Sequence, residues 1–553
     1  MLDPVTVEVV RNKLDGIAEE MQQTLLRASF SPIVKEGLDA SASLFTAEGE
    51  TLAQACAIPI HLATLVPVLE TIRRSFPPET MREGDVYLLN DPYTGGTHLP
   101  DIALVMPVFH QGRLIAFAAA MTHHQDMGGM SPASLPTNAT EIFQEGLRLP
   151  PLKFMEEGRE NATLVAILRQ NVRIPDTVMG DLRAQLSACL VGAGRIRALA
   201  DGLGGNLAVS IFAELLDRSE RLTRQALAAL PAGTWRNADH LDNDGIELDR
   251  PVRVEAAVTL GPGRFHVDFT GSGPQTRGPF NAVRSSVLAG VYFALRAITD
   301  PDIPNNGGCY RVVTLDLPEA SVVNPRAPAP VNARTATIKR IAGTILGALK
   351  DAIPGKVPAD NAGALHAIMF GGLREDGTAF VTGELITGGS GASARRDGVD
   401  VIETDATNCM NLPAEAMELE TPFRVNRIAL RPDSGGAGAH RGGLGFVKEY
   451  ECLAEEAVLT HRGERHYFAP AGSQGGGAGA MAQSFILRAD GRVEEVPSKT
   501  MARLFRGDRL LVQTPGGGGY GDPARRDPAA LAEDVADGKV SAEAARGLYG
   551  ATG

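Results

Sequence analysis

The sequence contains no run of 18 apolar residues, and this absence argues against a membrane-spanning helix. Charges are scattered through the first residues, MLDPVTVEVVRNKLDGIAEEM, where a signal peptide would carry an apolar core. Cysteine is scarce: five thiols lie far apart and form no CxxC pair. An odd, dispersed set is typical of reduced thiols rather than of a disulfide framework or a zinc ribbon. We therefore predict a cytoplasmic protein that makes no membrane contact.

Long basic stretches are also absent. The chain has 53 Lys and Arg against 66 Asp and Glu, a formal net charge of −13, and no basic run of five or more. Binding of nucleic acid requires a dense basic face, so we expect no nucleic-acid partner. The sequence has no GxxxxGK[ST] phosphate loop and no HExxH motif, which excludes a Walker-type ATP site and the standard helical zinc protease.

The composition is that of an ordinary globular protein. Apolar residues make up 44% and charged residues 22% of the 553 residues, a length that usually holds several domains. The hydrophobic patterns predict a mixed α/β (α+β) multi-domain fold. The predicted regions are a candidate metal-site region with a hairpin (1–155), a helical segment (156–230), a mixed α/β region (231–380), a glycine-rich, β-dominated region (381–523) and C-terminal helices (524–553).

The most distinct local pattern is a hairpin. Two apolar runs, IALVMPVF and LIAFAAAMTHH, are separated by the short polar segment HQGR. If Gln111 and Gly112 form a two-residue turn, the numbers of paired residues sum to 223, so that Asp101 faces Thr122. A single β-bulge would then bring Asp101 directly opposite His123.

This hairpin gives the motif THLPD…THHQDMGG a chemical meaning. Cross-strand neighbours have Cβ atoms about 5 Å apart, a gap that a metal ion with ligand bonds of about 2.1 Å can bridge. His98 lies in the loop at the same strand end, so two imidazoles and a carboxylate can converge. Such a set binds Zn²⁺, Mn²⁺ or Fe²⁺ and leaves positions open for water or substrate. In the alternative interpretation, His98, Asp101 and His123 are inert, hydrogen-bonded residues at a strand end.

Other polar residues near these motifs have alternative roles. Asp39 begins another apolar strand and could be a fourth ligand, although an Asp at a turn before a strand often has only a structural role. His61 follows AIPI, and we expect capping or packing rather than ligation. His124 and Asp126 could replace one of the ligands, or could orient them from behind.

Several unusual motifs then identify a family. In chain order the sequence contains NDPYTGGTHLPD, THHQDMGG, EGLRLPPLKF, RPDSGGAGAHRGG and TPGGGGYGDP. From about residue 2 to the C-terminus it resembles the hydantoinase B/oxoprolinase family. The resemblance implies a metal-bearing subunit of an ATP-dependent enzyme for cyclic amides, with ATP consumed in a hydantoinase A-type partner of actin-like kinase fold. It also places the family's metal ligands on Asp39, His98, Asp101 and His123.

Three functions follow as hypotheses. The preferred one is ATP-dependent ring opening of a hydantoin, 5-oxoproline or lactam: the partner phosphorylates the amide oxygen, the metal activates water, and His124 or Asp126 moves the proton. The glycine-rich loops would supply N–H groups for an oxyanion. The alternatives are a subunit of an ATP-dependent ketone carboxylase and a non-catalytic scaffold with a structural metal. The segment 331–340, VNARTATIKR, departs from the Gly-Asn-Thr-Glu-type sequence of many relatives and leaves the substrate open.

Overall fold

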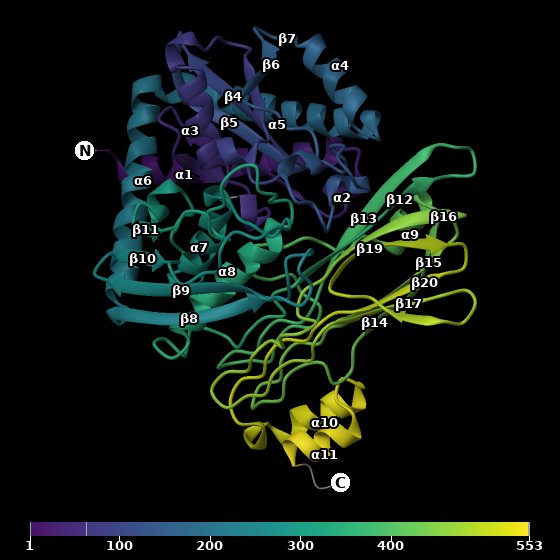
Figure 1. Cartoon of the computed structure of the whole chain (residues 1–553). Helices are drawn as coiled ribbons and strands as arrows, with labels where there is room; N and C mark the ends of the chain where they lie inside the picture. The colour runs from purple at the N-terminus through teal and green to yellow at the C-terminus, as the bar shows by residue number, and fades with distance from the viewer. Residues whose placement is uncertain (1, 62, 551–553) are drawn as a thin grey trace.

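A computed structural model describes residues 2–61 and 63–550. Four β-sheets and the helices between them form a mixed α/β, multi-domain structure, which confirms the predicted fold class. Figure 1 shows the N-terminal sheet and its helices in purple and blue, a central teal part, and two green-to-yellow sheets that project to one side. The predicted division into five regions stays a prediction.

The N-terminal sheet has seven strands in the order β2-β1-β5-β4-β3-β6-β7, all paired antiparallel. Its strands are β1 (Ala40–Thr46), β2 (Thr51–Gln54), β3 (Val86–Leu89), β4 (Asp101–His110), β5 (Arg113–His123), β6 (Leu152–Glu156) and β7 (Arg159–Glu160). The helices around it are α1 (Pro4–Ala28), α2 (Pro32–Lys35), α3 (Leu65–Ser75), α4 (Ala162–Asn171), α5 (Pro175–Leu203) and α6 (Gly205–Ala228).

Both faces of this sheet are covered, which explains the long, unbroken apolar runs in its central strands β4 and β5. Along β5, the alternate residues Ala116, Ala118 and Ala120 belong to the core shared with α1 and α5, while Phe117 and Met121 belong to the core beneath α3. Successive side chains of a strand point to opposite faces, so a strand covered on both sides must be apolar throughout. The helices of segment 156–230 therefore share a core with the sheet that precedes them.

The start of α1 follows the rules for helix N-termini. The Asp3 carboxylate accepts a hydrogen bond from the Thr6 N–H at 2.9 Å, and Pro4 occupies the first turn, where its missing N–H costs nothing. Among the described residues, no single helix is long and apolar enough to cross a membrane. The helices α5 and α6 meet the combined requirement of length and apolar character only as a pair, and the pair is bent by 109°.

The central part is a four-stranded sheet in the order β11-β10-β9-β8, against which two buried helices pack. Its elements are β8 (Gly233–Leu241), β9 (Val252–Gly261), β10 (Arg264–Asp268), α7 (Arg284–Ile298), β11 (Val313–Asp316) and α8 (Arg334–Leu349). The helix α8 begins in the divergent segment 331–340, and its first residue, Arg334, is buried.

Two antiparallel sheets make up most of the C-terminal part, in the orders β13-β12-β16-β19 and β14-β15-β20-β17-β18. Their strands are β12 (Leu365–Leu373), β13 (Ala379–Thr387), β14 (Phe423–Leu430), β15 (Phe446–Cys452), β16 (Glu456–Arg462), β17 (Gln483–Leu487), β18 (Val493–Glu495), β19 (Lys499–Phe505) and β20 (Arg509–Gln513). The helices of this part are α9 (Ala414–Glu420), α10 (Pro528–Ala536) and α11 (Ala542–Tyr549).

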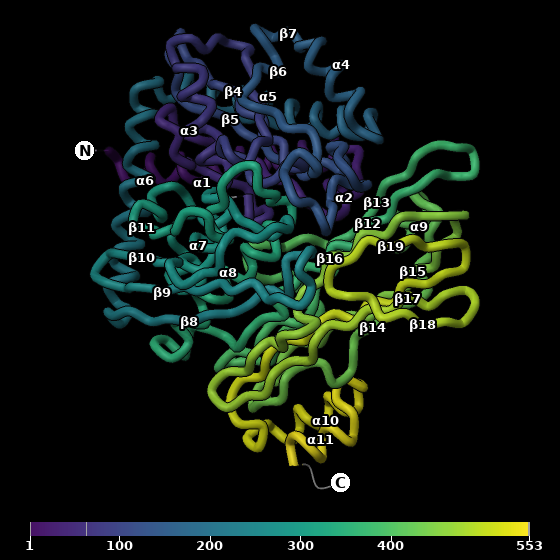
Figure 2. The backbone as a smooth tube through the Cα atoms, in the orientation of Figure 1, coloured from purple at the N-terminus to yellow at the C-terminus, as the bar shows by residue number. Residues whose placement is uncertain are grey.

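The glycine clusters of this part form a bundle of extended segments that lie against one another, visible in Figure 2 between the sheets and the last helices. A Cβ on Gly389 would lie 1.9 Å from the Gly443 carbonyl oxygen, and one on Gly517 would lie 2.0 Å from that of Ser390. The backbone N–H groups of Gly443 and Gly517 donate to carbonyls within the bundle. These N–H groups therefore hold the loops together, which corrects the expectation that they serve an oxyanion.

Candidate functional site

The β4–β5 hairpin has the predicted turn. His110 pairs with Arg113 around Gln111 and Gly112, whose φ angles of 50° and 76° lie in the left-handed region that two-residue hairpin turns require. The register then shifts by one residue between Val108 and Phe109. This shift confirms the predicted bulge, and it has the predicted consequence: Asp101 lies directly opposite His123.

His98, Asp101 and His123 form a compact, buried cluster. The Asp101 Oδ1 atom lies 2.8 Å from His98 Nε2 and 3.2 Å from His123 Nδ1, and the two ring nitrogens are 3.1 Å apart. One ligand atom from each residue lies within 4.8 Å of the others, and each residue is at most 7% exposed. The structure therefore brings together the three residues that the hairpin argument selected.

The backbone fixes the orientation of the His98 ring. Its Nδ1–H donates to the Asn332 carbonyl oxygen at 2.9 Å, because a carbonyl can only accept. The neutral ring then presents the lone pair of Nε2 to Asp101 and His123, the arrangement found in histidines that bind metals. Burial and the nearby Arg334 lower the pKa of His98 to about 3, which keeps the imidazole in the neutral form that a metal needs.

Asp39 and His61 extend the cluster. Asp39 faces the same cavity, and the His61 Nε2 atom lies 3.7 Å from Asp39 Oδ1 and 3.8 Å from Asp101 Oδ2. His61 is 1% exposed, and neither of its ring nitrogens has a hydrogen-bond partner among the described residues. The structure thus places His61 between two carboxylates, whereas the sequence suggested capping or packing.

These residues fit a divalent cation. Imidazole nitrogens and carboxylate oxygens are the ligands that Zn²⁺, Mn²⁺ and Fe²⁺ share. An unpaired, buried imidazole beside two carboxylates is costly without a further partner, and a cation would supply one. The donor set and the unpaired His61 ring therefore agree with the metal that the sequence predicts.

Arg334 is the cationic partner of Asp101 in the cluster. One of its Nη atoms donates to Asp101 Oδ2, and Thr97 donates a further hydrogen bond of 2.6 Å to the same oxygen. Burial raises the pKa of Asp101, but the charge of the adjacent Arg334 guanidinium opposes this effect, and the pKa of Asp101 lies well below its usual range. Asp101 is therefore ionised, although it is 0% exposed.

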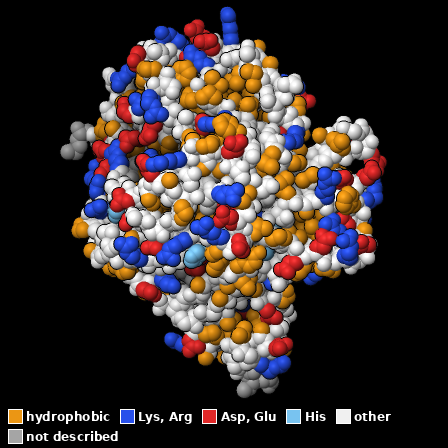
Figure 3. All heavy atoms as spheres, viewed as in Figure 1, with side chains coloured by type: hydrophobic (Ala, Val, Ile, Leu, Met, Phe, Trp, Pro, Cys, Tyr) orange, Lys and Arg blue, Asp and Glu red, His pale blue; other side chains and the backbone are white. Residues whose placement is uncertain are grey.

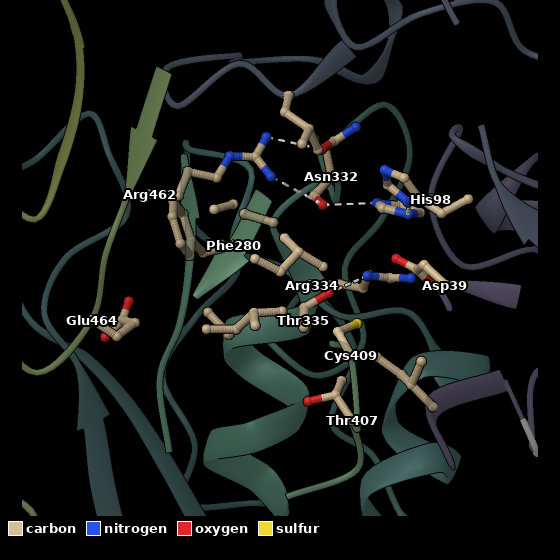
Figure 4. Close-up of a pocket in the computed structure, with 18 of the residues that line it drawn as sticks. Asp39, His98, Phe280, Asn332, Arg334, Thr335, Thr407, Cys409, Arg462 and Glu464 are labelled. Atoms are coloured by element: carbon tan, nitrogen blue, oxygen red, sulfur yellow. Dashed lines mark hydrogen bonds between the residues drawn. The ribbon is translucent and has the colours of Figure 1, made fainter. Parts of the chain in front are cut away.

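A cavity opens beside the cluster, shown in Figure 4. It lies between the N-terminal sheet, the start of α8 and the end of β16, and its walls combine apolar residues with two arginines, Arg334 and Arg462. Further lining residues are Asp39, Ile58, Ile60, His98, His123, Leu135, Phe280, Asn332, Leu365, Ala367, Leu385, Cys409 and Glu464. The site thus lies beside a cavity that could receive a small molecule.

The outer surface of the molecule is mixed in character. Figure 3 shows basic and acidic side chains interspersed over the visible face, with no large area of a single sign. The visible face therefore offers no charged patch as an alternative binding site to the buried cluster.

The structure does not bring His124 and Asp126 into this cavity. His124 Nε2 lies 3.0 Å from the Gln185 side-chain oxygen, and the Asp126 carboxylate binds Arg173 at 3.0 Å and two backbone N–H groups. His124 directly follows His123 along the chain, and neighbouring residues of an extended segment point to opposite sides. Both side chains are fully buried and engaged elsewhere, so the structure gives them a supporting position and no access to the cavity.

The sequence did not reveal Arg334, Asn332 and Arg462 as site residues. The only signal was that the first two belong to the divergent segment 331–340. Arg462 ends β16, more than 300 residues after the hairpin, and no local pattern relates it to the cluster.

Comparisons with known proteins identify the family to which the chain belongs. The sequence profile of the family described as hydantoinase B/oxoprolinase matches residues 3–523. A putative B-type subunit of a D-/L-hydantoinase from Pseudomonas sp. is 31% identical over 568 residues, covering 100% of this chain and 95% of the relative. The beta subunit of caprolactamase from Pseudomonas jessenii is 33% identical over 568 residues, covering 99% and 96%.

Solved structures show the same fold. The crystal structure of ATP-dependent caprolactamase from Pseudomonas jessenii superposes with a TM-score of 0.92 at 32% identity, covering 100% of this chain and 96% of that one. A nucleotide-free acetone carboxylase structure reaches the same TM-score at 21% identity, covering 100% and 80%, a likeness of fold. The chain spans about two fifths (42%) of the 5-oxoprolinase 1 of Arabidopsis thaliana, to which it is 30% identical.

Proposed function

The chain belongs to the hydantoinase B/oxoprolinase family, and we propose that it is the subunit of an ATP-dependent cyclic amide hydrolase that carries a metal-dependent hydrolytic site. The observation that carries the proposal is the buried His98–Asp101–His123 cluster at the end of the β4–β5 hairpin, of which His98 and His123 line the cavity. A site built on paired strands keeps its ligands in place better than one built on loops.

The residues of this chain would hold a divalent ion through His98, Asp101 and His123, with Asp39 and His61 beside them. When bound, such an ion acts as a Lewis acid and lowers the pKa of water toward neutrality. Asn332 keeps Nε2 of His98 aimed at the cluster, and Arg334 keeps Asp101 ionised. The apolar residues of the cavity wall lower the local dielectric, which strengthens the electrostatic effect of these groups on a bound amide.

The ATP-dependent step belongs, in this proposal, to a hydantoinase A-type partner. An unactivated amide is a poor electrophile, and phosphorylation of its oxygen would make it reactive. Two observations support a separate ATP-binding chain: this sequence has no Walker-type phosphate loop, and the hydantoinase and caprolactamase relatives are each named as one subunit of their enzyme.

The test is reconstitution of the chain with its A-type partner, followed by measurement of ATP-dependent ring opening of hydantoins and lactams. We expect His98→Ala to lose its metal, measured by elemental analysis, and roughly 100-fold or more of its turnover, the scale on which a single catalytic group acts. His110→Ala is the matched control, because His110 ends β4, far along the strand from the cluster, and pairs with Asp201. Full metal content and unchanged turnover in His98→Ala would end the assignment.

Two further measurements separate this function from its alternatives. A chelator should abolish turnover while the circular dichroism spectrum and the complex with the partner persist; loss of the fold instead would indicate a structural metal. Incorporation of labelled bicarbonate without ring opening would indicate a carboxylase. The likeness to acetone carboxylase is one of fold, so hydrolysis remains the proposal.

A further inference from the structure

Arg462 differs from the other buried arginines of the described residues. Five of the six buried arginines have a carboxylate within 4.0 Å, namely Arg334 with Asp101, Arg340 with Asp239, Arg441 with Asp534, Arg465 with Asp239 and Arg526 with Asp397. Arg462, which is 7% exposed, has no such partner in the part of the chain that the structure describes. A buried charge is costly unless it is paired, so this guanidinium calls for an anion.

Neutral groups hold the guanidinium of Arg462 in place. One Nη donates to the Pro136 carbonyl at 2.7 Å and to the Asn332 side-chain oxygen at 2.8 Å, and the other lies 3.4 Å from the Asn332 carbonyl oxygen. The Nε–H is buried and has no partner among the described residues. The carboxylate of Glu145, which acts on this charge from a distance, accepts hydrogen bonds from the N–H groups of Val331 and Asn332 instead.

The unpaired charge lies next to the candidate metal site. In Figure 4, Asn332 lies between Arg462 and His98, and its carbonyl oxygen is within hydrogen-bond distance of both side chains. Arg334 lines the same cavity and also has a buried Nε–H without a partner among the described residues. Leu135, Phe280 and Leu365 supply apolar walls.

We propose that Arg462, which lines the same cavity as Arg334, forms a subsite for a carboxylate, and that the substrate is therefore a cyclic amide that carries a carboxylate on its ring. A guanidinium binds a carboxylate through short, charge-assisted hydrogen bonds with a defined orientation. The carboxylate would anchor the ring against the apolar wall and leave the amide free to face the cluster. This inference rests on the proposed function, because it names the substrate class of the same site.

The test compares two probes that differ only in the carboxylate. Calorimetric titration of the metal-loaded, full-length chain with 5-oxoproline and with 2-pyrrolidinone, the same five-membered lactam without a carboxylate, measures the preference directly. We expect 5-oxoproline to bind at least tenfold more tightly. Equal binding of the two lactams, or preference for the neutral one, overturns the proposal without any variant.

Variants then locate the preference. We expect Arg462→Gln to lose it and Arg462→Lys, which keeps the positive charge, to retain part of it, with metal content unchanged in both. Arg326→Gln, at an exposed arginine paired with Glu319, is the control and should keep the full preference. A preference that survives in a folded Arg462→Gln protein overturns the assignment of the residue.

Inorganic phosphate is the second probe, because a phosphoryl group offers similar oxyanion chemistry. Displacement of 5-oxoproline by phosphate only at much higher concentration supports a carboxylate subsite. Tight phosphate binding that depends on Arg462, with no binding of 5-oxoproline, overturns it. Because binding is measured without ATP or the partner, its failure is distinct from failure of ring opening in the reconstituted complex.

Discussion

Substitution of Arg334 by methionine should have opposite effects on the metal-free protein and on metal affinity. The Arg334 guanidinium is the cationic partner of Asp101, and both side chains are at most 4% exposed. Removal of one member of a buried ion pair costs about 3–5 kcal/mol, because the other charge stays buried. In the variant, a divalent ion would neutralise Asp101 in place of the guanidinium and would no longer be repelled by it. The variant should therefore bind metal at least tenfold more tightly, a gain of about 1.4 kcal/mol in binding free energy.

The assay is urea unfolding with and without saturating Mn²⁺ or Zn²⁺, together with calorimetric metal titration. Ligand that binds only the folded state adds its binding free energy to stability, so the loss in Arg334→Met should be smaller with metal than without. Arg340→Met is a matched control on the same helix: it breaks a buried pair with Asp239 at 2.6 Å and should destabilise both forms equally. Weaker metal binding in Arg334→Met would show that Arg334 orients Asp101 and would refute the charge argument.

Three further outcomes follow from the same structure. Burial, with His466 nearby, lowers the pKa of His461 from 6.5 to about 3. As the pH falls, the imidazole of His461 is therefore protonated in the unfolded chain before it is protonated in the folded protein. The folded protein loses stability between pH 6.5 and pH 3 for this reason. Urea unfolding at pH 6 and pH 5 measures this loss. In the variant His461→Gln, the decrease in unfolding free energy per pH unit should be smaller by roughly 1.4 kcal/mol. Gly517→Ala should cost about 3 kcal/mol or more in thermal unfolding, whereas Gly343→Ala, in open space within α8, should stabilise by about 1 kcal/mol; equal effects would contradict the packed glycine bundle. Asp126→Asn should lower the unfolding free energy by about 1–3 kcal/mol but leave turnover within a few-fold of that of the unmodified protein. A loss of turnover as large as that expected for His98→Ala would show that Asp126 acts in the active site.

The sequence predicted those parts of the site whose geometry is local. The alternation of two apolar runs, the turn at Gln111 and Gly112, and one bulge sufficed to place Asp101 opposite His123, because the register of a hairpin follows from its turn. His98 followed because it precedes the same strand by three residues. Capping is local in the same way: Asp3 accepts a hydrogen bond from the N–H of Thr6, three residues along the chain.

The remaining site residues come from segments that lie far from the hairpin in the sequence. His61 ends a short 3₁₀ turn (Pro59–His61), Arg334 begins α8, and Arg462 ends β16. A histidine after AIPI or an arginine at a strand end has many ordinary roles, and no periodicity shows which carboxylate or cavity it will face. For His124 the local pattern was also insufficient: it is adjacent to a ligand, but extended backbone turns it to the other side.

The two parts of the candidate site are joined through one peptide group. The Asn332 carbonyl oxygen is 2.9 Å from His98 Nδ1 but 3.4 Å from an Nη of Arg462, so its stronger hydrogen bond is with the imidazole. An anion on Arg462 would compete for the guanidinium and leave the carbonyl to His98, whose Nε2 then becomes a better ligand. If a substrate carboxylate binds Arg462 as proposed, its position and the strength of metal binding are physically linked through Asn332.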